Sequence, residues 1–125
     1  MVTELISNLF LSTAAEVVDS AAMSMSGDNC AMLEFFVTSA DSLTGAGVTF
    51  ELQGSNDGIN WTSSLFSGSP NSLSTASGTT APSFGVAHAP LASGVVPYEK
   101  VRVRVTNGSS GTALVSARVT TYRQG

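Results

Sequence analysis

The chain has 125 residues, which fits one domain, and 42% of them are hydrophobic, enough for one apolar core. Only 11% are charged, the net charge is −4, and Cys30 is the single cysteine. These values exclude a disulfide-stapled scaffold and argue against a free duplex-binding protein, which would need a basic excess. The low charge favours a domain that buries much of its surface in contacts with neighbouring molecules.

The N-terminal third is ambiguous between helix and strand. Residues 3–10 suit either, and residues 14–25 are rich in Ala and Met but interrupted by Val and Ser. We expect strands in both stretches. Glu4 and the absence of an early Lys or Arg do not fit a signal peptide, and no apolar run reaches the ~20 residues that span a bilayer. We therefore expect no membrane partner.

Alternation of apolar and polar residues dominates the rest of the chain and predicts strands with one buried face. It places Leu33, Phe35 and Val37 on one face, and Val48, Phe50 and Leu52 on one face of the next strand. Asn56 to Gly58 suits a tight turn, after which Ile59 and Trp61 resume a strand with Trp61 in the core. The predicted core residues are Leu33, Phe35, Val48, Phe50, Leu52, Trp61, Val101, Val103, Val115 and Val119.

Residues 58–98 carry no charged side chain, only His88. Within them, residues 67–97 suit an extended loop or arm that packs on something, or equally a pair of weak strands joined by ordinary turns. We expect the 58–98 span to lie at contacts between subunits or with a larger particle. The candidate contact residues in it are Leu73, Phe84 and His88.

The C-terminal region reads as a β-hairpin over residues 98–122, with its turn at Asn107 to Gly111. Val101, Val103 and Val105 point inward on its first strand, and Val115, Ala117 and Val119 on its second. Residues 1–99 carry −9 and residues 100–125 carry +5, which sums to −4. In this register four cations share the outer face of the hairpin: Lys100, Arg102, Arg104 and Arg118.

These outward cations repel one another unless acids lie near them. Candidate partners are Glu51, Glu34 or acids of another subunit. Because complementary charge selects partners more than it tightens binding, we interpret Arg102 and Arg104 as interface residues. Reversing both charges should weaken assembly and leave the fold nearly intact, and added salt should weaken assembly of the unmodified protein.

The inventory of catalytic and metal-binding residues is thin. His88 is the only histidine and has no adjacent nucleophile and carboxylate, and zinc needs more His or Cys ligands than the chain offers. Asn56, Asp57 and Asp41 lack the carboxylate cluster of a calcium loop. We expect no enzyme activity and no cofactor.

Three segments together resemble a known class of protein: FELQGSNDGINW at residues 50–61, PYEKVRVRVT at 97–106 and GTALVSARV at 111–119. They are similar to small β-sandwich structural proteins of tailed bacteriophages, of the kind that decorates capsids. SNDG followed by Trp61, with Tyr98 before VRV, also resembles discoidin-like carbohydrate-binding modules, a weaker likeness. Both cover under a third of the chain.

The fold that we expect is all-β, a single-domain antiparallel β-sandwich of jelly-roll-like topology. The phage resemblance implies a capsid decoration (cement) protein of the virion, assembled in the host cytoplasm. Its partners would be the major capsid protein and two further copies in a homotrimer, with no nucleic acid. The alternative function is a carbohydrate-binding module or a tail or fibre adhesin.

Overall fold

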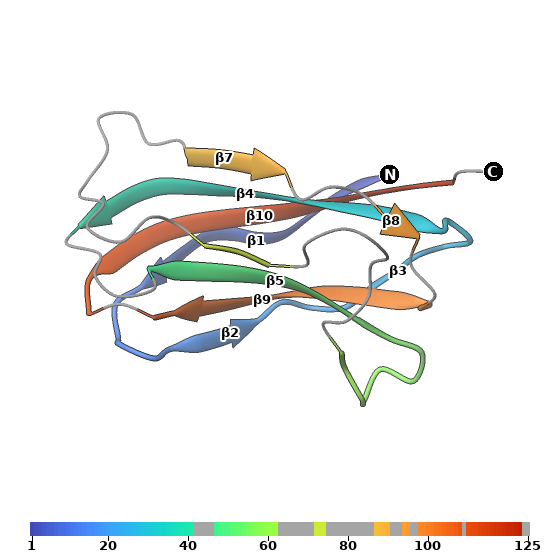
Figure 1. The fold of residues 1–125 in the computed structure, drawn as a ribbon, viewed down its shortest axis with the longest axis horizontal. Coiled ribbons are helices and arrows are strands. Elements are labelled where there is room, and N and C mark those ends of the chain that lie inside the picture. Colours follow the sequence, from blue (N-terminus) through green and yellow to red (C-terminus); the bar gives the residue numbers. More distant parts are fainter. Residues whose placement is uncertain are drawn as a thin grey trace.

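The computed structural model describes residues 1–41, 47–62, 72–74, 87–90, 94–95, 98–108 and 110–123. Of residues 39–41, 72–74, 87–90 and 94–95 it describes the backbone alone. The described residues form two antiparallel sheets stacked face to face and contain no helix (Figure 1). The prediction of an all-β sandwich is confirmed, including strands in the N-terminal third.

Sheet A is built on three long strands, β1, β10 and β4, which lie side by side in that order. β7 and β8 both pair with β4 on its other side. Val2 on β1 pairs with Thr120 on β10, so the start of β1 and the last part of β10 lie side by side at one end of the sandwich (Figure 1). The bounds are β1 Val2–Leu11, β4 Cys30–Asp41, β7 Ala87–Pro90, β8 Gly94–Val95 and β10 Thr112–Tyr122.

Sheet B has the order β2, β9, β5 and β6, and β3 pairs with β9 beside β2. β5 and β9 form its centre, with all eight residues of each strand paired. Among the described strands, β1 and β2 therefore each lie at the edge of their own sheet. The bounds are β2 Val17–Asp19, β3 Met23–Ser24, β5 Val48–Ser55, β6 Ser72–Ser74 and β9 Lys100–Asn107.

The connectivity of the two sheets is that of a jelly roll. β2 and β3 share the partner β9, and β7 and β8 share the partner β4, so each pair acts as one interrupted strand. When each pair is counted as one strand, the described strands number eight in chain order, and the two sheets have the orders 1-8-3-6 and 2-7-4-5. This is the double Greek key of a jelly roll, and the sequence predicted a jelly-roll-like sandwich.

The core is a layer of aliphatic side chains between the sheets, with one aromatic contact across it. Every second residue of β9 and β10 is buried, as the alternation predicted. The rings of Phe35 on sheet A and Phe50 on sheet B stack with centroids 4.3 Å apart. Nine of the ten predicted core residues are buried: Leu33, Phe35, Val48, Phe50, Leu52, Val101, Val103, Val115 and Val119.

The predicted hairpin over residues 98–122 is wrong. β9 pairs with β5 in sheet B, whereas β10 pairs with β1 and β4 in sheet A. The chain after Asn107 therefore crosses from one sheet to the other. A strand with one buried face shows the same alternation whether its neighbour in sequence lies beside it or across the core, so the pattern could not separate the two.

The strand predicted after the Asn56–Gly58 turn is also wrong. The chain bends through residues 56–60 and then returns to sheet B, where Thr62 pairs with Gly54. Ile59, expected to alternate with a buried Trp61, has 80% of its surface exposed. A structured loop, described below, takes the place of the strand.

Candidate functional site

The two predicted interface arginines face outward from β9 on sheet B, and both reach the same carboxylate. Arg104 donates from Nε to Oδ1 of Asp19 at 2.7 Å and from Nη2 to Oδ2 at 3.1 Å. Nη2 of Arg102 lies 3.6 Å from Oδ2 of the same residue. β2 supplies this acid because Asp19 stands directly opposite Arg104 in the register. Asp19 was not predicted from the sequence. The run Val17-Val18-Asp19 could have indicated a short strand that turns Val18 inward and Asp19 outward.

A hydrogen-bonded chain continues across the same face. Nε of Arg102 donates to Oε1 of Gln53 at 2.8 Å, and Nε2 of Gln53 donates to Oε1 of Glu51 at 2.7 Å. Glu51, one of the predicted acidic partners, stands opposite Arg104 on the neighbouring strand. Acids of the same chain therefore lie close to both arginines on this face.

The pKa values of this cluster shift in the direction that its ion pair dictates. The hydrogen bond from Arg104 holds the pKa of Asp19 below its usual value, with partial burial opposing the shift and the Arg102 charge assisting it. The same contact raises the pKa of Arg104, so both groups stay ionised at neutral pH.

Trp61 lies over this face and is half-buried, which corrects the prediction that it belongs to the core. The chain reversal after β5 sets Thr62 opposite Gly54. Alternation then turns the neighbouring residue, Trp61, to the outer face of sheet B. The guanidinium of Arg102 stacks on the indole, 4.3 Å from the ring centroid, in a cation–π contact.

The outer face of sheet A lies over its three long strands, β1, β10 and β4. Arg118 donates to Glu34 through two bonds of 3.1 and 3.4 Å, as the sequence allowed, and its guanidinium lies 5.0 Å above the ring of Phe36. Arg118 is thus on the opposite side of the sandwich from Arg102 and Arg104, because β9 and β10 are not a hairpin. The large apolar side chains that share this face are Val2, Phe10, Met32, Phe36 and Leu114.

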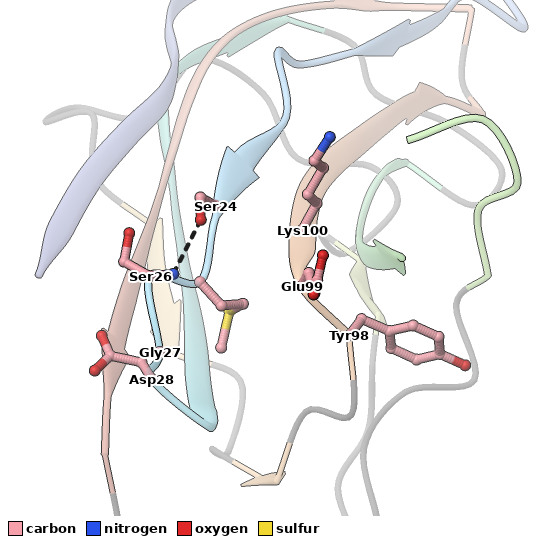
Figure 2. Close-up of a pocket in the computed structure, with 8 residues that line it drawn as sticks. Ser24, Ser26, Gly27, Asp28, Tyr98, Glu99 and Lys100 are labelled. Carbon is pink, nitrogen blue, oxygen red and sulfur yellow. Dashed lines mark hydrogen bonds between the residues drawn. The ribbon is translucent and has the colours of Figure 1, made fainter. Parts of the chain in front are cut away.

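A pocket of about 410 Å³ opens at the end of the sandwich where the β3–β4 turn meets the start of β9 (Figure 2). Ser26 and Gly27 have φ of 50° and 82°, and Asp28 N donates to Met25 O at 2.9 Å, which is a type I′ turn. Oδ2 of Asp28 accepts a bond of 2.7 Å from Thr121.

The polar groups of this pocket do not converge on one point. Figure 2 shows the ring of Tyr98 turned away from Asp28 and Ser26, with Glu99 between them. No nucleophile, base and orienting acid are therefore brought together among these lining residues. We regard the pocket as the meeting point of a turn and a strand, not as a reaction site.

The loop after β5 is ordered by one carboxylate. Oδ1 of Asp57 accepts bonds of 2.8 Å from the amides of Ile59 and Asn60 and of 2.9 Å from the Ser55 hydroxyl. Its Oδ2 accepts a bond of 2.7 Å from Nδ2 of Asn60. These donors, the Asn60 amide first, hold the pKa of Asp57 far below its usual range.

Three further predicted contact residues fall in or beside undescribed parts of the chain. The backbone register sets Leu73 opposite Phe50 and His88 opposite Phe36, and their side chains lie outside the description. Phe84 lies outside the described residues altogether. Most of the 67–97 segment does as well, apart from the short strands β6, β7 and β8.

Within the described residues, no group of three or more His, Cys, Asp or Glu side chains could hold a metal ion. In the same part of the chain, no helix is long and apolar enough to cross a bilayer. Cys30 is a buried thiol at the start of β4.

No family model matches this chain, and none of the curated proteins matches its sequence. The fold does have relatives among solved structures. The PBSX exported protein XepA superposes with a TM-score of 0.68 at 12% identity; the match covers 100% of this chain and 38% of XepA. The present chain thus spans little more than a third of that protein.

Two other matches cover nearly the whole of both chains. The C-terminal CBM6 of LamC, a marine laminarinase from Zobellia galactanivorans, gives a TM-score of 0.55 at 12% identity, covering 96% of this chain and 99% of the module. The SPBc2 prophage-derived protein YomS gives 0.52 at 9% identity, with 95% and 92% covered. At these identities the likeness establishes the β-sandwich fold alone.

Proposed function

We propose that this chain is a structural protein of a bacteriophage virion, a capsid decoration protein that binds across neighbouring subunits of the major capsid protein. It works by adhesion, as a homotrimer, with no cofactor, no catalysis, no nucleic acid and no membrane. It joins the particle in the host cytoplasm. The likeness of its fold to the prophage-derived YomS supports this assignment.

The outer face of sheet A is the observation on which the proposal rests. Val2 and Phe10 are 60% and 57% exposed there, and half-buried Met32, Phe36 and Leu114 continue the apolar surface. The Arg118–Glu34 pair supplies one charge-balanced contact within it. Glu4, Arg118 and Glu34 form one charged row across the middle of this face, and the apolar side chains lie on either side of that row. Such a mixture of apolar and charged side chains is the ordinary composition of a non-obligate protein interface.

The size of this face suits a protein partner. β1, β10 and β4 are 10, 11 and 12 residues long. At about 4.8 Å between strands and 3.4 Å per residue, three such strands cover about 500 Å². A standard interface buries about 800 Å² per partner, so this face supplies a large part of one contact. Repetition over a capsid lattice multiplies such contacts into stable attachment.

Carbohydrate binding is the second candidate, and Trp61 is the observation that favours it. The half-exposed indole lies on an outer sheet face against Arg102, which is bonded to Gln53 and through it to Glu51. Fold neighbours include the carbohydrate-binding module of LamC. Arg102, however, already occupies a face of the indole that a sugar ring would stack on. We therefore rank this function second.

The test is an add-back experiment with phage particles purified from a strain that lacks the gene for this chain. Purified chain is mixed with these particles and with complete particles, and both are pelleted. We expect the chain to co-sediment saturably with the particles that lack it, and little of it to co-sediment with complete particles. Chain that stays in the supernatant while glycans shift the Trp61 fluorescence would overturn the proposal in favour of carbohydrate binding.

A further inference from the structure

The loop at residues 55–60 presents one large apolar side chain on a rigid support. Ile59 has 80% of its surface exposed, the highest value among the exposed large hydrophobic residues of the described chain. Asp57 fixes the backbone on both sides of it, since the amides of Ile59 and Asn60 both donate to its Oδ1. A rigid loop that exposes an isoleucine loses little conformational freedom when that side chain is buried by a partner.

Two further contacts hold the base of this loop. Oδ1 of Asn56 accepts a bond of 2.8 Å from the amide of Glu99, which ties the loop to the start of β9. Gly58 has φ of +75°, a backbone conformation that residues with a side chain rarely adopt, so the tight turn favours a glycine. The loop projects beyond the sheets at one end of the sandwich (Figure 1).

A groove of about 420 Å³ lies elsewhere on the molecule, between the edge strands β1 and β2. Two register shifts interrupt β1 on either side of Ile6, and Asn8 has φ of 50°. The edge is therefore too irregular for strand addition and suits a side chain as its occupant. The apolar residues that line the groove are Leu5, Ile6, Leu9, Phe10 and Val18.

The rim of the groove and the loop match in polarity. Ser7, Asn8, Ser20 and Ala21 border the groove, and its one acid, Asp19, is engaged by Arg104. The loop flanks its isoleucine with Gly58 and Asn60, and the carboxylate of Asp57 is occupied by the loop's own donors. An apolar side chain surrounded mainly by polar groups is the arrangement found at the centre of protein interfaces. The charged neighbours here are Lys100 beside Gly58 on the loop and the Asp19–Arg104 pair at the groove.

We propose that the Ile59 loop of one copy inserts into the β1–β2 groove of a second copy of this chain. The Ile59 loop and the β1–β2 groove lie at different places on the molecule, so the contact is head-to-tail. Each copy inserts its Ile59 into one neighbour and binds the Ile59 of another in its own groove. Such a contact closes into a ring when the rotation allows, and a trimer is the ring that the proposed decoration function needs. The contact forms in solution without a particle, so it can fail independently of capsid docking.

Pairwise cross-linking tests the head-to-tail geometry. Ile59→Cys chain and Ser7→Cys chain are oxidised separately and as a mixture, with wild type as the control for Cys30, which is buried. We expect a disulfide-linked species that joins the two variants in the mixture only. A link formed by Ile59→Cys alone would mean a symmetric contact, and no link in any sample would mean no contact; either result overturns the proposal.

Hydrodynamic measurement tests the energetic role of the isoleucine. Sedimentation equilibrium should show wild-type self-association that weakens about tenfold or more in Ile59→Ser, because the buried apolar area is lost. The matched control is Val17→Ser, which removes an aliphatic side chain that is 51% exposed on the outer face of sheet B and does not line the groove. Equal association of all three proteins, or a wild type that stays monomeric, would overturn the proposal.

Blocking the groove gives the complementary result. Ala21 is exposed on its rim, so Ala21→Arg should fill the groove without disturbing the core. We expect the same loss of association as in Ile59→Ser, with an unchanged thermal melt. Normal association of Ala21→Arg would show that this groove is not the receiving surface.

Discussion

The indole of Trp61 shows how one local feature redirects a residue that the sequence assigned to the core. Alternation with Ile59 predicted a strand, but the carboxylate of Asp57 accepts hydrogen bonds from the amides of Ile59 and Asn60, and the chain turns there. Trp61 then meets Arg102 on the outer face of sheet B. The turn at Asn56–Gly58 was readable from the sequence, whereas the direction of the chain after it was not.

Arg102→Ala should expose the indole. Loss of the cation–π contact should cost about 0.5–1 kcal/mol and shift the emission of Trp61 to longer wavelength, with easier quenching by acrylamide. Trp61 is the only tryptophan, so the signal has one source. Arg118→Ala, which removes a guanidinium stacked on Phe36 instead, is the control and should leave the emission unchanged. An Arg102→Ala spectrum identical to wild type would contradict this placement.

The Asp19–Arg104 pair should make stability depend on pH in one direction. The pKa of Asp19 is lowered in the folded chain, so its contribution is present above the ordinary value near 3.8 and is lost as the pH falls through the folded pKa. At 32% side-chain exposure, solvent screening limits the contribution to less than about 1 kcal/mol.

Urea unfolding of wild type and Asp19→Asn measures this contribution. We expect wild type to be the more stable at pH 7 and the difference to shrink below pH 3.8. A double-mutant cycle with Arg104→Met isolates the coupling between the two side chains. A difference that grows as the pH falls would contradict the assignment.

Among the elements, the strands were predictable and their partners were not. Alternation located β4, β5, β9 and β10, because buried and half-buried residues alternate along β9, β10 and the first half of β5. The same alternation does not indicate which sheet a strand joins. For that reason β9 and β10 were wrongly predicted to form one hairpin. The bulges of β1 have no sequence signature of this kind.

Asn107 is the residue that braces the crossing between the two sheets. It is fully buried, and its Nδ2 donates to the carbonyl oxygens of Thr13 at 3.1 Å and Gly111 at 3.3 Å. Its backbone N–H donates to Glu16 O and its carbonyl oxygen accepts from Ala15 N. A side chain that ties three segments at a sheet-to-sheet crossing is the kind of polar group that a hairpin turn would not bury.

Asn107→Ala should destabilise the fold by about 1–3 kcal/mol, because buried carbonyl groups lose their donor. The matched control is Asn56→Ala, which removes one acceptor at an exposed loop and should cost less than about 1 kcal/mol. Chemical denaturation of both variants and wild type checks the order. Equal costs for the two substitutions would show that Asn107 is not a structural brace.

For the whole molecule, the fold was more predictable than the site. Composition and alternation were sufficient for a sandwich with its core between two sheets, since the burial of one apolar face per strand contributes most of the stabilisation of such a fold. The arrangement of side chains on the outer faces depends on contacts between segments far apart in the chain, such as Asp19 with Arg104 and Glu34 with Arg118. Arg102 and Arg104 have partners within the chain, and their role at an interface stays a prediction.

The central claim is that this sandwich decorates a phage head, and electron cryomicroscopy of re-decorated particles tests it most directly. Particles that lack the chain are imaged before and after the purified chain is added. We expect new density, of the size of this β-sandwich domain, that repeats over the head lattice at junctions between capsid subunits. Density confined to the tail or fibres, or no added density at saturating chain, would contradict it.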